Sequence, residues 1–130
     1  MFDWKKPTVQ MLGRWQPWHQ GHQELFKRCV AKTGQVIIQV RDVQGASGGL
    51  GQDDNPFDWD LVCKNIEEGL AKDKFHRGNQ YEIMLVPNIV NISYGRGVGY
   101  VFDEEVFDEA IHSISATKIR KELREKADLD

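Results

Sequence analysis

The spacing of apolar and polar residues along the chain alternates between the pattern of strands and the pattern of helices. Apolar segments at residues 8–12, 35–41 and 81–86 predict strands, and the nearly continuous run at 35–41 is typical of a strand buried on both faces of a parallel sheet. Residues 21–33 have the apolar spacing of an amphipathic helix, which Gly34 would end. Strand, helix and strand in this order predict a βαβ unit with a right-handed crossover.

The rest of the chain continues this alternation. A helix start at Pro56 precedes an apolar stripe at helical spacing, residues 89–92 and 101–107 predict a fourth and a fifth strand, and a last helix begins near Ser115. The whole pattern predicts an α/β fold, with a doubly wound, mostly parallel, five-stranded Rossmann-like sheet that carries helices on both faces. We expect residues 1–130 to form a single domain. The apolar stripe consists of Trp59, Val62, Ile66 and Leu70.

Composition and charge narrow the classes of function. The chain has 130 residues, of which 40% are hydrophobic and 28% charged, values that are ordinary for a soluble globular domain. Its net charge of -3 argues against a broad basic surface, so we expect no nucleic acid partner. No apolar run is long enough to span a bilayer, and the first residues lack the apolar stretch of a signal peptide. We therefore expect a cytoplasmic protein without a membrane partner, in which Cys29 and Cys63 are buried thiols.

Candidate chemistry is concentrated in residues 13–22, Gly-Arg-Trp-Gln-Pro-Trp-His-Gln-Gly-His, where the first predicted strand gives way to the first helix. A helix start has free backbone N–H groups and a positive dipole end, which together bind phosphate. His19 and His22 add side-chain donors at the same point, and Gly21 permits close approach of the backbone. Structural hydrogen bonds to carbonyls are the alternative. A metal site is not favoured, because zinc needs four ligands and no partners are evident.

A second motif lies at residues 114–120, Ile-Ser-Ala-Thr-Lys-Ile-Arg. Ser115 can cap the last predicted helix, and Thr117 adds a hydroxyl in its first turn. Lys118 and Arg120 place positive charge near an already positive helix end, which is unfavourable until an anion binds there. The motif thus indicates a phosphate site, with scattered charge on a surface helix as the alternative.

The two motifs resemble those of one known family. Residues 13–22 are similar to the GRFxPxHxGH signature of the nucleotidyltransferase superfamily, which includes adenylyltransferases and cytidylyltransferases, with Trp15 and Trp18 where phenylalanine is common. Residues 114–120 are similar to the family's ISSTxIR, with Ala116 in place of the second serine. The motifs occur in the family's order, one near each end, so the resemblance extends over essentially the whole chain.

The resemblance implies transfer of a nucleoside monophosphate from a nucleoside triphosphate to a phosphorylated small-molecule acceptor, with release of pyrophosphate. It favours ATP over CTP, because the final motif RTxGISTT of the cytidylyl branch is absent. Mg²⁺ would neutralise the triphosphate, and a homo-oligomer stays open because relatives often assemble. The resemblance implies that His19, His22 and Arg120 are catalytic. The residues that it implies for nucleotide binding are Gly13, Arg14, Trp15, Gly21, Ser115, Thr117 and Lys118.

The acceptor site has weaker signals. Arg41 and Asp42 end the second predicted strand, at the edge where α/β proteins bind ligands, although a solvated strand end explains them equally. Tyr94 and Arg96 lie in a glycine-rich turn and are further candidates for acceptor binding. The glycine-rich loop at 45–51 is either a lid or a connector. A non-catalytic nucleotide-binding or regulatory module of the same fold is the alternative to an enzyme.

Overall fold

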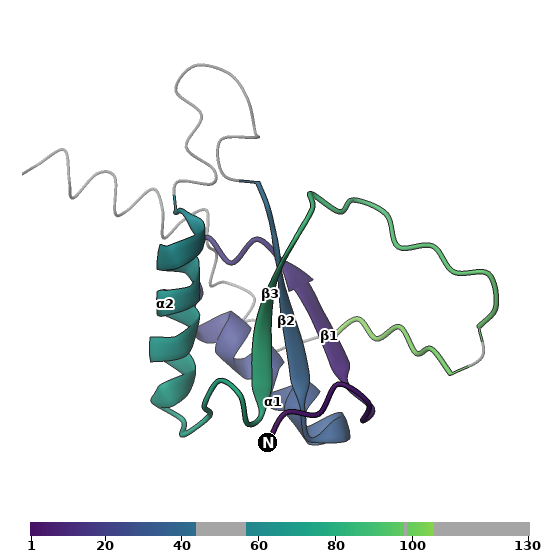
Figure 1. The fold of residues 1–130 in the computed structure, drawn as a ribbon, viewed down its shortest axis with the longest axis horizontal. Helices are drawn as coiled ribbons and strands as arrows, with labels where there is room; N and C mark the ends of the chain where they lie inside the picture. Colours follow the sequence, from purple (N-terminus) through teal and green to yellow (C-terminus); the bar gives the residue numbers. More distant parts are fainter. Residues whose placement is uncertain (44–56, 98, 106–130) are drawn as a thin grey trace, which may run out of the picture.

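The computed structural model describes residues 1–43, 57–97 and 99–105 and gives them an α/β fold (Figure 1). The elements follow one another as β1 (Val9–Gly13), α1 (Gln20–Thr33), β2 (Val36–Arg41), α2 (Trp59–Ala71) and β3 (Tyr81–Val86). The strands form one parallel sheet in the order β1-β2-β3, in which Val9 pairs with Val36 and Val36 with Tyr81. The predicted βαβ unit and the parallel sheet are confirmed for these strands.

One face of the sheet carries the hydrophobic core. Along β2, Val36, Ile38 and Val40 are buried, whereas the residues between them are half-buried. Strand side chains alternate between the two faces, so the buried set defines the face on which the helices pack. The helices contribute fully buried side chains to the same cluster, among them Phe26 from α1 and Ile66 from α2.

The helices of the described residues therefore share one face. The last predicted helix, near Ser115, lies outside the described residues, so coverage of both faces stays a prediction. The strand order explains why α1 and α2 lie on the same side. Each connection steps to the next strand in the same direction along the sheet, and crossovers of one hand then place both helices on one side. Helices on the other face would require a connection that reverses this direction.

Both helices have well-defined ends. The carboxylate of Asp58 accepts a hydrogen bond from the backbone N–H of Leu61 at 2.9 Å and caps the start of α2. Helix α1 ends as predicted at Gly34, whose φ of 92° lies in the left-handed region that favours glycine. The backbone N–H of Gly34 donates to the carbonyl of Val30 at 2.8 Å. The predicted helix start at Pro56 lies outside the described residues.

Residues 87–97 and 99–105 form an arm that contains no strand, which corrects the predicted strands at 89–92 and 101–107. Pro87 has no N–H to donate to a strand ladder. The N–H of Ile89 donates to the carbonyl of Pro87 at 2.7 Å, which closes a three-residue turn where an extended strand would need its N–H for a neighbour. Residues 106 and 107 of the predicted fifth strand lie outside the described residues.

The arm leaves the end of β3, loops outward and returns toward the sheet (Figure 1). Its apolar side chains are largely exposed, with Val90 83% and Val101 81% accessible. Lys32 of α1 holds the returning end through ion pairs with Asp103, at 2.7 Å, and with Glu105. The arm is therefore fastened by surface charge and not by burial in the core.

A buried glutamine fastens the N-terminal residues to the start of β2. Gln35 is 5% exposed, and its Oε1 accepts a hydrogen bond from the backbone N–H of Asp3 at 3.0 Å. Its Nε2 donates to the carbonyl of Asp3 and to Oγ1 of Thr8, both at 2.6 Å. These hydrogen bonds close the end of the sheet at which the strands begin.

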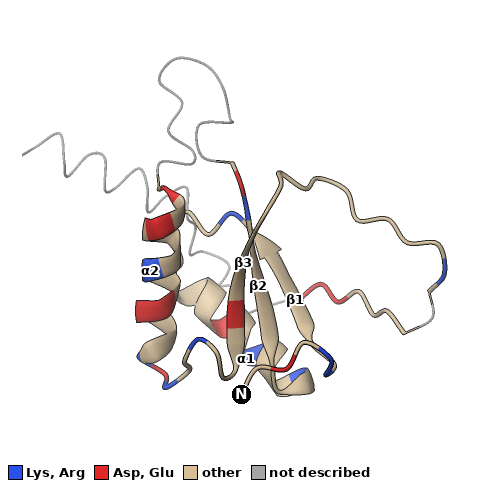
Figure 2. Ribbon diagram, viewed as in Figure 1, with Lys and Arg blue, Asp and Glu red and all other residues tan. Residues whose placement is uncertain are grey.

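Charged side chains lie on the exposed side of α2 and in the connections, whereas the strands are mostly uncharged (Figure 2). Arg77 joins α2 to β3, since its Nη1 lies 2.9 Å from Oε1 of Glu67 and its Nε lies 2.8 Å from Oε1 of Glu82. In the described part of the chain, neither α1 nor α2 is long and apolar enough to cross a membrane.

The end of β1 gives a prediction for stability. Gly13 lies directly against the buried indole of Trp15, and a Cβ at Gly13 would lie 2.8 Å from Cζ2 of that ring. We predict that Gly13→Ala lowers the free energy of unfolding by about 1–3 kcal/mol, measured by chemical denaturation, because the indole must move. Gly95→Ala is the matched control, since nothing lies within 4 Å of its Cβ. Equal losses in the two variants would contradict the prediction.

Candidate active site at the start of helix α1

The start of α1 is capped by two imidazoles. His19 is the N-cap residue and has extended backbone, and its Nδ1 accepts a hydrogen bond from the backbone N–H of Gly21 at 3.0 Å. Nδ1 of His22 accepts in turn from the backbone N–H of His19 at 3.2 Å. The sequence predicted free backbone N–H groups at this point. Instead, the histidines occupy two of these N–H groups with their own ring nitrogens.

This capping decides which ring nitrogen carries the proton. A neutral imidazole has one N–H and one acceptor nitrogen, and Nδ1 is the acceptor in both rings. His19 and His22 therefore each carry their proton on Nε2. No group in residues 1–43, 57–97 or 99–105 hydrogen-bonds to either Nε2 atom, so each ring presents an N–H donor that a ligand can use.

The two rings lie face to face. Their centroids are 3.7 Å apart and their planes differ by 18°. The rings are thus nearly parallel, and each is held through its Nδ1 atom. The first turn of α1 contains no acidic residue, so no side chain there compensates the positive end of the helix dipole.

The indoles of Trp15 and Trp18 bury His22. The ring of Trp15 meets His22 edge-on with centroids 4.7 Å apart, and the ring of Trp18 lies 5.5 Å from it. Burial, assisted by the charge that His19 can carry, lowers the pKa of His22 to about 3. Burial also lowers the pKa of His19. Both rings are therefore neutral near pH 7 and remain hydrogen-bond donors through Nε2.

The indoles belong to the core more than to a ligand pocket. Trp15 and Trp18 are only 5% and 9% exposed. Nε1 of Trp15 donates to the carbonyl of Gln39 on β2 at 3.1 Å, and Nε1 of Trp18 donates to Oε1 of Gln23 at 2.8 Å. The structure places Trp15, a predicted nucleotide-binding residue, beneath the histidines, where its ring shapes the site from below.

A second glutamine joins the turn to the segment that leads into α2. Gln16 is 3% exposed, its Nε2 donates to the carbonyl of Phe57 at 2.8 Å, and its Oε1 accepts from the N–H of the same residue at 2.8 Å. The side-chain amide of Gln16 thus satisfies both backbone hydrogen-bonding groups of a residue 41 positions away, as a neighbouring strand does in a sheet. Gln16 and Gln23 did not emerge from the sequence as site residues. For Gln23 a signal existed, because a glutamine three residues before Phe26 shares the apolar face of α1.

The remaining predicted residues divide by location. Arg41 ends β2 at the edge where the parallel strands end, the same edge at which the turn after β1 lies. Its Nη2 donates to Oδ1 of Asn88 at 2.7 Å, while its Nε is buried and has no hydrogen-bond partner among the residues that the structure describes. The backbone N–H of Asp42 donates to the carbonyl of Val86 at 2.8 Å, and the Asp42 side chain is exposed. Arg14 is half-buried just after β1.

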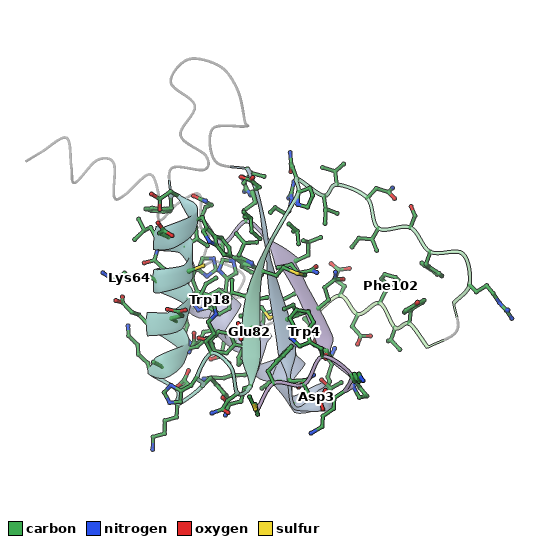
Figure 3. The ribbon with its side chains drawn as sticks, in the orientation of Figure 1. Asp3, Trp4, Trp18, Lys64, Glu82 and Phe102 are labelled. Atoms are coloured by element: carbon green, nitrogen blue, oxygen red, sulfur yellow. The ribbon has the colours of Figure 1, made fainter. Side chains whose placement is uncertain are left out.

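Tyr94 and Arg96 lie on the arm and not with the histidines. The ring of Tyr94 stacks on Phe102 with centroids 5.1 Å apart. Figure 3 shows Phe102 on the arm, on the opposite side of the sheet from Trp18, which lies between the sheet and α2. The structure therefore does not bring these two predicted acceptor residues together with the imidazole pair.

The second motif falls outside the described residues, and so does the glycine-rich loop at 45–51. This covers Ser115, Thr117, Lys118 and Arg120, so their approach to the histidines stays a prediction. Within the described ranges, no three or more His, Cys, Asp or Glu side chains are grouped so that they could hold a metal ion.

Comparison with known proteins gives one partial similarity. No family model matches the chain. A segment of 34 residues is 38% identical to a nicotinamide-nucleotide adenylyltransferase of Methanococcus maripaludis. The segment makes up 26% of this chain and only 20% of that relative's length. This similarity supports a resemblance to the nucleotidyltransferase superfamily and extends no further.

The burial of His22 predicts a pH dependence of stability. In the unfolded chain His22 has a pKa near 6.5, and in the fold its pKa is about 3, so between these values the unfolded state binds more protons. Stability is therefore complete above pH 6.5 and falls as the pH decreases toward 3, by up to about 1.4 kcal/mol per pH unit from this residue. His22→Asn, whose Oδ1 can still accept from His19, lacks this titration. Denaturation between pH 6.5 and 4 should give the variant a shallower slope, and equal slopes would refute the burial.

Proposed function

We propose that this protein is a nucleotidyltransferase. It transfers a nucleoside monophosphate from a magnesium-bound triphosphate, preferably ATP, to a phosphorylated small molecule and releases pyrophosphate. The observation that carries the proposal is the stacked pair His19 and His22, two neutral rings that offer Nε2–H donors at the positive end of α1. The partial similarity to an adenylyltransferase agrees with it.

The proposed reaction is a single displacement at phosphorus. An oxygen of the acceptor phosphate attacks the α-phosphorus, the bond from that phosphorus to the bridging oxygen breaks, and pyrophosphate leaves with the electron pair. Negative charge increases on the α-phosphate oxygens, and the Nε2–H groups of His19 and His22 donate to them. Both donors are fixed in advance by their Nδ1 hydrogen bonds, so little reorganisation is needed as the charge develops.

The neutrality of the rings fits this role. A buried imidazole with a pKa of about 3 keeps one proton on Nε2 through the physiological range, so its donor capacity does not change with pH there. We expect Mg²⁺ to be held mainly by phosphate oxygens and water, where it offsets the charge of the triphosphate.

The other residues complete the proposal as expected contacts. Ser115, Thr117, Lys118 and Arg120 bind the β- and γ-phosphates, and Arg14 and Gly21 line the nucleotide side of the turn. Gly13 and Trp15 act through packing, because the indole lies buried against both the glycine and His22. For the acceptor we favour Arg41 and Asp42 over Tyr94 and Arg96, because Arg41 ends β2 at the edge where the turn after β1 also lies.

The test is a panel of the four common nucleoside triphosphates with Mg²⁺. Thermal shifts identify the nucleotide, since a ligand at a hundred times its dissociation constant adds about 2.7 kcal/mol to stability. Pyrophosphate release with phosphorylated acceptors then measures turnover. We predict that His22→Asn retains the fold and lowers turnover by about a hundred- to a thousandfold, because one donor to the developing charge is lost.

The matched control is His76→Asn, which changes an exposed histidine between α2 and β3. His76→Asn should release pyrophosphate at the same rate as the unaltered protein. Nucleotide binding without pyrophosphate release in any acceptor reaction would establish the non-catalytic module instead. Equal turnover by the His22 and His76 variants would refute the site.

The second motif gives a separate prediction. Arg120→Ala should weaken binding of the triphosphate more than binding of the corresponding monophosphate, because only the triphosphate has the distal phosphates that a guanidinium would bind. Isothermal titration with both nucleotides measures the two affinities. Lys121→Ala removes a neighbouring positive charge outside the motif and should affect both nucleotides little. Equal losses for the two nucleotides in Arg120→Ala would show that Arg120 does not bind the distal phosphates.

A further inference from the structure

Gln23 is a polar residue in an apolar position. It lies on α1 directly after His22, its side chain is 6% exposed, and it faces α2. Its Oε1 accepts from Nε1 of Trp18 at 2.8 Å. Its Nε2 donates to the carbonyl of Gly69 at 2.8 Å and to Oδ2 of Asp73 at 2.7 Å.

These contacts use both N–H groups of the amide and place its oxygen on a donor. Rotating the amide by 180° would put its oxygen against two acceptors and its NH₂ group against the indole N–H of Trp18. The orientation of Gln23 is therefore determined by its surroundings. Lys27 stabilises the outer end of the arrangement, because its Nζ lies 3.3 Å from Oδ2 of Asp73.

Trp18 is held on two sides as a result. Its N–H is fixed by Gln23, and the pyrrole edge of its ring lies against Gly69 of α2, where an added Cβ would be 2.8 Å from Cδ1 of the indole. The same indole also contacts His22, with centroids 5.5 Å apart, and Trp15, with centroids 5.3 Å apart. The indole of Trp18 thus connects Gln23 to His22.

We propose that Gln23 is a positioning residue, which fixes the indole of Trp18 as a wall that excludes water from His22 and holds the His22 ring in its stacked orientation. This inference rests on the proposed function for its catalytic consequence. Gln23 touches neither the expected substrate nor the reacting atoms, and it acts through Trp18.

Helix α1 has anchors in the core besides Gln23. Helix α1 is anchored by Phe26, which is fully buried, and by Cys29 at 4% exposure. Gln23 takes no part in the Nδ1 hydrogen bonds of the imidazoles, which are made to the backbone N–H groups of Gly21 and His19. Among the described residues, the ionisable group that acts on His22 is His19, the N-cap residue of α1, whereas Trp15 and Trp18 present uncharged surfaces. Asp73 and Lys27 contact the glutamine and not the histidine ring.

The test replaces Gln23 by methionine, which has similar length and no amide. Gln35→Met is the matched control, because Gln35 is equally buried and makes a comparable set of hydrogen bonds at the opposite end of the sheet. Proton–nitrogen NMR of the imidazole resonances then follows His22 from pH 7 to pH 3. In Gln23→Met the pKa of His22 should rise by one unit or more from its value of about 3, while in Gln35→Met it stays unchanged.

Trp18→Phe removes the same hydrogen bond by deleting the donor, Nε1 of Trp18. This second variant keeps the test decisive if Gln23→Met fails to fold. It should raise the pKa of His22 as Gln23→Met does, and the double variant should give no further rise, since both changes act through one contact. An unchanged His22 titration in Gln23→Met, equal rises in both glutamine variants, or additive effects in the double variant would each overturn the inference.

The kinetic measurement separates this inference from the function itself. We expect Gln23→Met to lower kcat by roughly ten- to a hundredfold, with a smaller change in KM for the triphosphate, because the histidine is misplaced while the rest of the nucleotide site is retained. The His22 titration needs no turnover. If the unaltered protein releases no pyrophosphate, the proposed function is wrong. The NMR comparison then still decides whether Gln23 fixes the position of the Trp18 indole beside His22.

Discussion

The two hydrogen bonds from backbone N–H groups to the Nδ1 atoms of His19 and His22 are the constraint on which the site depends. They satisfy donors that a helix start leaves without partners, so they favour formation of α1. They also assign the proton of each ring to Nε2, which leaves that nitrogen as the donor of each ring. The same pair of contacts therefore serves the formation of the helix and, in the proposed function, the binding of phosphate.

Burial determines the protonation state of His19 and His22. The indoles of Trp15 and Trp18 surround His22 and keep it neutral, and buried glutamines connect the same turn to the two ends of α2. A turn between a strand and a helix is often a mobile surface feature. Here it is continuous with the core on one side and presents a small polar surface on the other, which is the arrangement that electrostatic preorganisation requires.

Local patterns predicted the described helices and strands well and the segment after β3 poorly. The buried run in β2 and the glycine after α1 fixed element bounds to within a residue or so, because burial alternation and helix ends are local properties. The apolar segments at 89–92 and 101–105 had the composition of strands, but strand formation needs a neighbour with free backbone groups. Pro87 and the turn that follows direct the chain away from the sheet edge, so these segments became an exposed arm.

The sequence by itself determined where the candidate site lies and that His19 and His22 belong to it, because a strand-to-helix turn with two histidines three positions apart is a local arrangement that periodicity and capping chemistry reveal. Only the tertiary structure decided that both rings are neutral donors through Nε2, that Trp15 and Trp18 are buried against His22, and that Gln16 and Gln23 join the turn to α2. These properties arise from burial and from hydrogen bonds between residues 41 and 46 positions apart, as in Gln16 with Phe57 and Gln23 with Gly69. Spacing along a chain does not specify such pairs, because they form only when packed elements bring distant residues together.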